Sequence, residues 1–371
     1  MTTEVDITRL AEWIARTQAF PPDTAIVSFI RFSGGQSSEL FRLVCHSHGA
    51  GEEHFIVRLE QRGNQLFMQP DIVREFRVMD GVANAGTVPV PQLLAVESDP
   101  SVLGQRFLVM REVEGKSPLG RPSLHSAGLL TGLAPDERGR IAENGIDAMA
   151  AIHGIDWRKS HTFLAEGNDG RTGLEAHLAR LVKWYGWATR GRPFPITDRA
   201  LEYLLANRSN LQDTEEVLLW GDARPGNILF AEDQSVAAVL DWEGALIGPR
   251  GIDVAYWVMS DEFHAEAIGL QRSPGWPSVE GVLARYRAAA GKDVPDLDYF
   301  VIMGAFFMGT TLIRATDIAI AAGRLTPDST MAKANTLTQI LADRLGLAVP
   351  SLSPDFVRHR SLPPGTLGLA K

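Results

Sequence analysis

The 371-residue chain has a single cysteine, Cys45, so it cannot form an internal disulfide bond. This scarcity is typical of proteins that work in a reducing cytosol. The first residues are acidic and polar and do not resemble a secretory signal, which also favours a cytoplasmic protein. The longest apolar run, Tyr299 to Ile313, is shorter than the roughly 20 residues needed to span a bilayer. We therefore expect it to form a buried helix, and we expect no membrane partner.

Positive charge is scarce as well. Lysine and arginine together number 36 against 45 aspartates and glutamates, which gives a net charge of −9. Such a balance argues against a nucleic-acid partner and mildly favours neutral or cationic ligands. Lysine is entirely absent before Lys116, so any cation that the first third of the chain supplies to a ligand has to be an arginine or a histidine.

Several widespread functional motifs are also missing. Gly115–Lys116–Ser117 is similar to the end of a P-loop, but Met110 occupies the position where the first glycine is required. The chain has no Gly-x-Gly-x-x-Gly fingerprint of a Rossmann fold and no Gly-x-Ser-x-Gly nucleophile elbow. Its histidines are scattered without the spacing of zinc ligands. These absences exclude the commonest motif-based nucleotide, hydrolase and zinc sites.

The most informative segments are Leu219 to Phe230 and Val239 to Glu243. They place Asp222, Asn227 and Asp241 at a spacing that suits phosphoryl transfer from a nucleotide. That chemistry uses one carboxylate to orient and deprotonate the attacking hydroxyl, and an asparagine and a second carboxylate to hold Mg²⁺ on the phosphates. The intervening residues predict a β-hairpin that brings Asn227 near Asp241. The alternative interpretation is that Asp222 and Asn227 are ordinary turn residues.

These residues resemble the catalytic and metal-binding segment of the aminoglycoside phosphotransferase/choline kinase-like family, over about Ile26 to Leu341. The resemblance implies an α+β, protein-kinase-like fold with a small antiparallel-sheet N-lobe and a larger, mainly helical C-lobe. It implies ATP or GTP and Mg²⁺ as cofactors, Asp222 as the catalytic base, and Asn227 and Asp241 as metal ligands. The family usually has histidine where this chain has Trp220, which leaves open how the catalytic loop is packed.

Within the first lobe, two predicted strands flank a glycine-containing turn whose Ser33, Gly34, Gly35 and Ser37 are candidate phosphate contacts. The alternative is a plain hairpin turn. Phe55 to Leu59 predicts a third strand.

The fold normally has a phosphate-binding lysine on that strand, and Arg58 is the only cation in the strand core. Arginine can bind phosphate through two hydrogen bonds. Glu75, on a helix predicted around Asp71 to Val82, suits the acidic partner of Arg58. Either residue can instead be a solvated surface charge.

The linker between the lobes is expected after the strand Phe107 to Met110. By position in the family, the Arg111 carbonyl and the Val113 amide would hydrogen-bond adenine, and Met110 would line the back of the adenine pocket. The alternative is a strand end with a core methionine. We divide the chain into an N-terminal lobe at 1–113, a C-terminal lobe at 114–349 and a loosely packed, proline-rich tail at 350–371.

In the C-terminal lobe we expect His153 to be structural, and we expect Asp253 to cap a helix and to brace the catalytic loop. Four acidic residues are either a wall for a cationic amino sugar or amino alcohol, or a solvated face: Asp261, Glu262, Glu266 and Asp317.

The function that the sequence predicts is Mg²⁺-assisted phosphoryl transfer to a hydroxyl of a small molecule, with no expectation for the oligomeric state. The alternative is a nucleotide-binding module with little or no transferase activity, which the altered Trp220 and Arg58 keep open. A protein kinase is a weaker alternative, because no His-Arg-Asp, Asp-Phe-Gly or Ala-Pro-Glu series is present.

Overall fold

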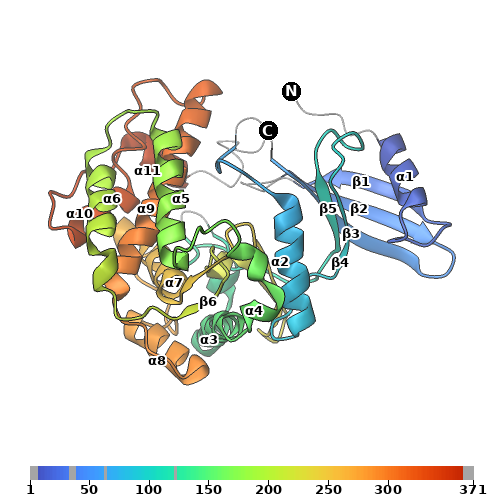
Figure 1. The fold of residues 1–371 in the computed structure, drawn as a ribbon, viewed down its shortest axis with the longest axis horizontal. Coiled ribbons are helices and arrows are strands. Elements are labelled where there is room, and N and C mark those ends of the chain that lie inside the picture. The colour runs from blue at the N-terminus through green and yellow to red at the C-terminus, as the bar shows by residue number, and fades with distance from the viewer. Residues whose placement is uncertain (1–6, 33–38, 62–64, 121–122, 362–371) are drawn as a thin grey trace.

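The structure is a computed structural model that describes residues 7–32, 39–61, 65–120 and 123–361, and for Glu266 and Ser361 it describes the backbone alone. The chain forms two lobes, a small one built on an antiparallel sheet and a larger, mainly helical one (Figure 1). This arrangement confirms the predicted α+β, protein-kinase-like fold.

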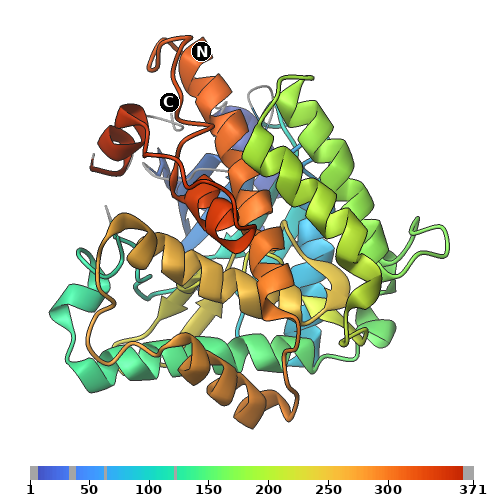
Figure 2. The same ribbon diagram turned by 90° about the vertical axis from the view of Figure 1, so that its left-hand side faces the viewer.

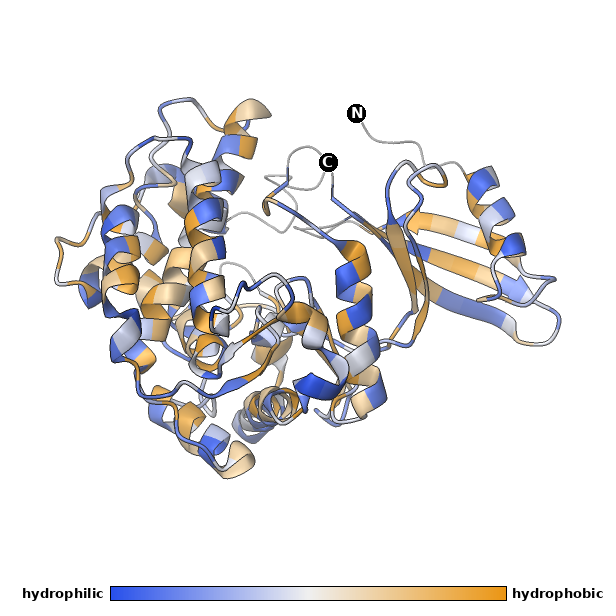
Figure 3. Cartoon of the chain, in the orientation of Figure 1, coloured by the Kyte–Doolittle hydropathy of each residue, from blue (hydrophilic) through white to orange (hydrophobic). Residues whose placement is uncertain are grey.

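The N-lobe sheet has the strand order β1-β2-β3-β5-β4, and all neighbouring strands are antiparallel. Its strands are β1 (Ala25–Arg31), β2 (Glu39–Ser47), β3 (Gly51–Leu59), β4 (Leu93–Glu97) and β5 (Phe107–Arg111). Figure 3 shows apolar residues concentrated along these strands. One face is covered by α1 (Ile7–Arg16), which the sequence analysis did not predict, and the Trp13 ring of α1 lies 4.9 Å from the ring of Phe107.

Helix α2 (Ile72–Ala85) lies between the lobes. The Asp71 side chain accepts a hydrogen bond from the Arg74 amide and begins the helix, and Gly86 in the left-handed region ends it. Its buried residues Val78, Met79 and Val82 belong to the same hydrophobic cluster as the C-lobe helices rather than to the N-lobe core. The helix therefore bridges the lobes, because it packs beside the N-lobe strands β4 and β5 while these side chains join the C-lobe core.

The C-lobe is built around α9 (Leu297–Ala321) (Figure 2). Four helices pack against it: α5 (Gly173–Thr189), α6 (Pro195–Asn207), α7 (Gly251–His264) and α10 (Thr336–Arg344). Helix α9 is long and apolar enough to cross a membrane, but 78 % of its most apolar 18-residue stretch is buried inside the protein. The predicted buried helix is confirmed, and it is longer than the apolar run that predicted it. The other helices of the lobe are α3 (Pro135–His153), α4 (Trp157–Ser160), α8 (Val279–Ala290) and α11 (Pro354–Ser361).

Two short two-stranded sheets hold the segments that the sequence analysis singled out. Strand β6 (Glu216–Leu219) pairs with β9 (Leu246–Pro249), and β7 (Ile228–Phe230) pairs with β8 (Val236–Val239). The second pair is the predicted hairpin. Lys116, just after the linker, forms an isolated bridge with Phe230 and so attaches the linker to this hairpin.

The expected loose packing of the tail is wrong for residues 350–361. Helix α11 buries Phe356, which is 2 % exposed and belongs to the main C-lobe cluster, and the Ser353 amide donates to the Ala334 carbonyl. The burial of Phe356, together with the hydrogen bond from the Ser329 hydroxyl to Asp355, docks the helix, although the composition around it is typical of a linker. Residues 362–371 lie outside the described residues, and the division of lobes at residue 113 stays a prediction.

Candidate active site

Asp222 and Asn227 lie at the two ends of a tight loop between β6 and β7. The loop ends in a single 3-10 turn, Pro225–Asn227. Asn227 is 4 % exposed, and its side-chain nitrogen donates to the Asp222 carbonyl at 3.0 Å and to the Asp222 carboxylate at 2.6 Å. These two bonds fix both side chains and leave the amide oxygen of Asn227 on the side away from Asp222.

The hairpin brings Asp241 next to Asn227, as predicted, because the Leu240 amide donates to the Asn227 carbonyl at 2.8 Å. Asp241 itself has φ of +62°, a left-handed conformation that is uncommon for a residue with a side chain. Conformations of this kind carry a cost of order 1–3 kcal/mol and are concentrated at functional sites, where surrounding contacts hold them in place.

Arg58 of β3 is the centre of a buried cluster of charges. The guanidinium contacts three carboxylates, Asp241 at 2.8 Å, Glu243 at 3.0 Å and Glu75 at 3.2 Å, and its side chain is only 8 % exposed. The predicted contact between Arg58 and Glu75 is thus confirmed. Glu243 was missed by the sequence analysis, although its place two residues after Asp241 is a usable signal, because a short turn brings such neighbours to one site.

Three carboxylates around one guanidinium do not all ionise normally. Burial raises the pKa of Glu75 to about 7 and that of Glu243 to about 8, and the negative charge of Asp241 adds to both shifts while Arg58 opposes them. Burial acts in the same direction on Asp241, but the charge and hydrogen bond of Arg58 outweigh it, so the pKa of Asp241 lies below its ordinary value. The cluster therefore keeps Asp241 charged at neutral pH.

Two further residues border Asp222. The Arg224 Nε lies 3.2 Å from both carboxylate oxygens of Asp222, and although burial opposes it, the charge of Asp222 raises the pKa of Arg224 above its ordinary range. Tyr256 of α7 is 6 % exposed, and burial followed by the charge of Asp222 raises the pKa of its phenol. Neither was predicted. Tyr256 lies on a helix that follows in the sequence, and spacing does not reveal which of its residues reach the loop, whereas the position of Arg224 two residues after Asp222 is a usable local signal.

The catalytic loop is held from below by Asp253 of α7. Its carboxylate accepts hydrogen bonds from the Trp220 amide at 2.7 Å and from the Gly221 amide at 2.9 Å. The expected brace is confirmed, but the expected helix cap is wrong, because α7 begins at Gly251 and the Asp253 carboxylate points to the loop. His153 lies 3.1 Å from the same carboxylate and 2.6 Å from the Tyr286 hydroxyl, as a buried structural residue.

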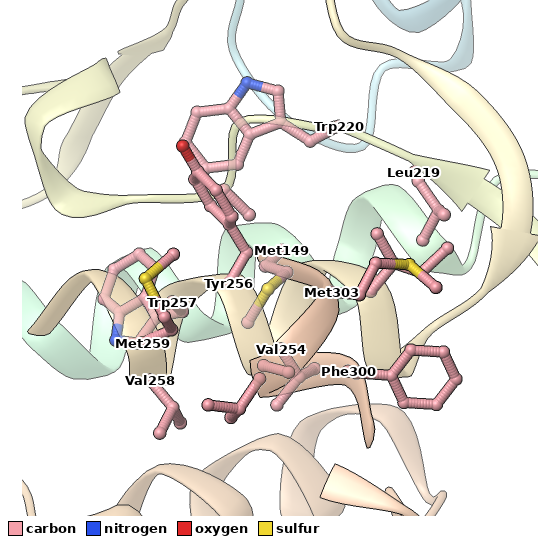
Figure 4. Packing of buried hydrophobic residues seen from close by; sticks show 14 of the residues in the cluster. Met149, Leu219, Trp220, Val254, Tyr256, Trp257, Val258, Met259, Phe300 and Met303 are labelled. Atoms are coloured by element: carbon pink, nitrogen blue, oxygen red, sulfur yellow. The ribbon is translucent and has the colours of Figure 1, made fainter. Parts of the chain in front are cut away.

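Trp220 replaces the usual histidine with a larger side chain that keeps one donor. Its indole Nε1 donates to the Leu240 carbonyl at 2.7 Å, immediately before Asp241, and the residue is fully buried. Figure 4 shows Trp220 with Tyr256, Trp257 and Met149 in the surrounding core. Gly221 has φ of +88°, and a Cβ there would lie 2.1 Å from the Gly244 carbonyl, so only glycine allows the two loops to touch.

The predicted adenine-binding residues lie at the end of β5. Met110 is half-buried and packs against the C-lobe cluster. The Arg111 amide donates to the Gln92 carbonyl, just before β4, and the Glu112 amide donates to the His54 carbonyl of β3. The backbone groups of successive residues therefore point alternately toward β4 and toward β3. By that alternation the Arg111 carbonyl and the Val113 amide lie on the side away from β3. The predicted phosphate contacts Ser33, Gly34, Gly35 and Ser37 lie outside the described residues.

The hypothesis of an acidic wall is not supported by the pairing of the residues proposed for it. Asp261 contacts His125 and Arg272, Glu262 contacts Arg344, and Asp317 contacts Arg192 and Arg314. Each of these three carboxylates therefore has a cationic or ionisable neighbour, and Glu266 is not described beyond its backbone. The lobe offers no row of unpaired carboxylates from these three residues to a cationic substrate.

The donor set fits Mg²⁺ with nucleotide phosphates. Mg²⁺ binds oxygen ligands, usually one or two carboxylates together with phosphate oxygens. Asp241 and Asn227 carry such oxygens on the two segments that the bond from the Leu240 amide to the Asn227 carbonyl joins. Within the part of the chain that the structure describes, the buried Nε of Arg58 has no hydrogen-bond partner. A buried guanidinium with an unused donor is suited to an incoming phosphate oxygen.

Three comparisons bear on this site. The model of the phosphotransferase enzyme family matches residues 28–291, more than half of the chain. Acyl-CoA dehydrogenase family member 11 of Rattus norvegicus is 25 % identical over 339 residues, which cover 89 % of this chain and 41 % of that protein. The chain thus spans about two-fifths of the length of that relative.

Solved structures show the same fold. A protein of Ralstonia eutropha JMP134, assigned provisionally as an aminoglycoside phosphotransferase, has a TM-score of 0.68 at 23 % identity and covers 92 % of this chain and 99 % of its own. An aminoglycoside phosphotransferase APH(4)-Ia mutant in complex with ADP and hygromycin B has a TM-score of 0.56 at 15 % identity, covering 91 % and 97 %.

Proposed function

Because the chain belongs to the phosphotransferase enzyme family, we propose that it transfers the γ-phosphoryl group of ATP or GTP to a hydroxyl of a small molecule, in the cytosol. The observation that carries this proposal is the joint placement of Asp222, Asn227 and Asp241 around one loop and one hairpin, with Arg58 on the facing strand. The dehydrogenase activity in the name of the rat relative is not carried over, because the matched family is a phosphotransferase family.

In the proposed reaction, Asp222 accepts a hydrogen bond from the acceptor hydroxyl and takes its proton as the oxygen attacks the γ-phosphorus. The bond from this phosphorus to the β,γ-bridging oxygen breaks, and ADP or GDP leaves. Asn227 fixes the Asp222 carboxylate and Arg224 neutralises part of its charge. Arg58 faces the phosphates, and the Arg111 and Val113 backbone holds adenine. Mg²⁺, held by Asn227 and Asp241, would neutralise charge on the phosphate oxygens. Positioning and electrostatics would supply most of the acceleration.

The decisive experiment measures phosphoryl transfer from ATP and GTP to a panel of small alcohols, with Asp222→Asn beside the wild type. Asn is nearly isosteric but cannot take the proton, so we expect transfer to fall by about 10²–10⁴-fold. Binding of Mg²⁺–nucleotide, measured by thermal shift, should stay close to that of the wild type in this variant.

The alternative is a nucleotide-binding module without transferase activity, which the ion pair between Arg58 and Asp241 favours because it occupies both residues. Tight Mg²⁺–nucleotide binding without turnover of any alcohol would support that alternative. Transfer within a few-fold of wild type in Asp222→Asn would refute Asp222 as the base. The matched control is Asp233→Asn, which removes a carboxylate in the exposed hairpin turn and should change neither readout.

A further inference from the structure

Helix α2 reaches the segment that carries Asp241 with two successive side chains. Glu75 contacts the guanidinium of Arg58 at 3.2 Å, and Arg58 in turn contacts Asp241 and Glu243. The preceding residue, Arg74, lies one step earlier in the same turn of the helix. The sequence analysis did not single it out, and the proposed reaction gives it no role.

Arg74 contacts the backbone of this segment rather than its side chains. The guanidinium donates to the Ala245 carbonyl at 2.5 Å and to the Glu243 carbonyl at 3.4 Å, through its two terminal nitrogens. The Arg74 amide donates to the Asp71 carboxylate at the start of α2, so the backbone of Arg74 is fixed as well. The planar guanidinium therefore ties the first turn of α2 to two carbonyls that are two residues apart.

The segment from Asp241 to Ala245 needs such support. Asp241 has φ of +62°, and a conformation of this kind persists only where the surroundings hold it. On the side of the catalytic loop, Gly244 lies against Gly221, since a Cβ on Gly221 would be 2.1 Å from the Gly244 carbonyl oxygen. The segment thus lies between the catalytic loop and α2, and Arg74 supplies hydrogen bonds from the α2 side.

This arrangement connects the position of α2 to the geometry of a proposed metal ligand. Glu243 is held at two points, because its carboxylate contacts Arg58 and its carbonyl accepts from Arg74. Asp241 precedes it by two residues and shares the contact with Arg58. Groups that hold a metal ligand without touching the metal fix its orientation, and their loss weakens metal binding.

We propose that Arg74 is a positioning residue of the metal site, whose two hydrogen bonds hold the segment Asp241 to Ala245 in the conformation in which Asp241 binds Mg²⁺ with nucleotide. The proposal rests on the proposed function and adds a residue to it that acts through the backbone. What matters is the pair of hydrogen bonds, so the positive charge of Arg74 alone does not replace them.

The test measures binding of a non-hydrolysable ATP analogue to the full chain by titration calorimetry, without Mg²⁺ and over a series of Mg²⁺ concentrations. Arg74→Met keeps the apolar stem and removes both donors. We expect the Mg²⁺ concentration for half-maximal binding to rise roughly 10- to 100-fold, as is usual for losing a group that orients a metal ligand. Binding without Mg²⁺ should stay at the wild-type value.

Two further variants separate positioning from charge and from general packing. Arg74→Lys keeps the charge but loses the two-pronged contact, so its Mg²⁺ requirement should lie between those of the wild type and Arg74→Met. Arg138→Met is the matched control, because Arg138 also donates to two carbonyls, Leu130 at 2.7 Å and Pro274 at 3.3 Å, outside the candidate site. It should leave the Mg²⁺ requirement unchanged.

Hydrogen exchange gives a second readout that needs no ligand. The amides of residues 242–245 should exchange faster in Arg74→Met than in the wild type or in Arg138→Met, because the segment opens more often. Arg74→Lys should show a smaller increase, and it decides the question if Arg74→Met does not fold.

A wild-type Mg²⁺ requirement in Arg74→Met overturns the proposal, as does an equal rise in Arg138→Met or unchanged hydrogen exchange. Wild-type behaviour of Arg74→Lys overturns it too, since charge alone would then suffice. Failure of the proposed function appears separately, as a wild-type chain that binds no Mg²⁺–nucleotide, and hydrogen exchange then still decides whether Arg74 holds the segment.

Discussion

Two sets of charged side chains lie at the candidate site, and they have different balances. Around Arg58, three carboxylates surround one guanidinium, so acidic groups outnumber the cation. Around Asp222, the guanidinium of Arg224 faces one carboxylate, which also accepts a hydrogen bond from the Asn227 side chain.

The difference teaches how one small region can separate two ligands. Excess carboxylate is what a site needs in order to hold a divalent cation on a nucleotide, since the metal supplies the missing positive charge. A single carboxylate paired with one guanidinium has no such excess, and it retains acceptor capacity for a neutral hydroxyl. Under the proposed function, the set around Arg58 therefore belongs to Mg²⁺–nucleotide and the set around Asp222 belongs to the acceptor.

The largest expected effect comes from breaking the first set. Arg58→Ala leaves Asp241, Glu243 and Glu75 buried without their cation, and removing one partner of a buried pair typically costs about 3–5 kcal/mol of unfolding free energy. Denaturant unfolding should show this loss, and thermal shift with Mg²⁺–nucleotide should become weak. Arg58→Lys should retain part of both, because the ammonium keeps the charge but loses the two-pronged contact.

The control for Arg58 is Arg31→Ala on β1, which removes a partly exposed ion pair with Glu39. Exposed pairs contribute about 1 kcal/mol or less, so this variant should remain near wild type in both measurements. A wild-type thermal shift in Arg58→Ala would show that the phosphates are held by another cation.

The comparison also explains what the sequence could predict. Asp222, Asn227 and Asp241 lie within twenty residues of one another, and a hairpin of recognisable composition joins them, so local pattern was sufficient. The pairing of Arg58 with Glu75 could be predicted because the N-lobe lacks lysine and leaves one cation on strand β3. Both inferences depended on short-range spacing or on scarcity.

The missed residues share a different property. Tyr256 of α7 reaches Asp222 through the packing of a helix that follows the loop by about thirty residues, and Glu243 reaches Arg58 across the two lobes. Helix α1 and the docked helix α11 were missed because their composition is that of surface segments, although burial of Trp13 and Phe356 and side-chain hydrogen bonds fix them to the rest of the protein. Contacts of this kind depend on the tertiary arrangement, which residue spacing does not contain.

A smaller effect on stability and on Mg²⁺ dependence is expected from Trp220, whose indole joins the catalytic loop to the residue before Asp241. Trp220→Phe keeps an aromatic ring but removes the bond to the Leu240 carbonyl, and a buried acceptor left without its donor costs about 1–3 kcal/mol. Because Leu240 precedes Asp241, we also expect the Mg²⁺ concentration needed for half-maximal nucleotide binding to rise.

Trp242→Phe is the matched control for Trp220, since its indole is equally buried and donates to Val239 within the hairpin at 3.0 Å. It should lose similar stability without changing the Mg²⁺ requirement. Trp220→His restores a ring donor and should recover part of the Mg²⁺ effect. Identical Mg²⁺ dependence in the two Phe variants would assign Trp220 to packing alone.

The smallest effect concerns the protonation of the first set. The pKa of Glu243 rises from 4.5 to about 8 on folding, chiefly through burial and then through the charges of Asp241, Glu75 and Asp222, with Arg58 opposing. Between these values the folded state binds the proton and the unfolded state does not. The stabilising contribution of Glu243 to the free energy of unfolding is therefore fully present below about pH 4.5, and it is lost as pH rises toward 8.

Glu243→Gln carries a permanently neutral group of the same shape, so the decline of the melting temperature between about pH 5 and 8.5 should become shallower. Asp241 does not interfere in this window, because its pKa is lowered and its contribution is lost only in stronger acid. Glu202→Gln, a surface residue paired with Arg199, is the control and should leave the slope unchanged. A slope in Glu243→Gln as steep as that of the wild type would mean that Glu243 is already ionised in the folded protein, and that the negative excess around Arg58 is larger than burial allows.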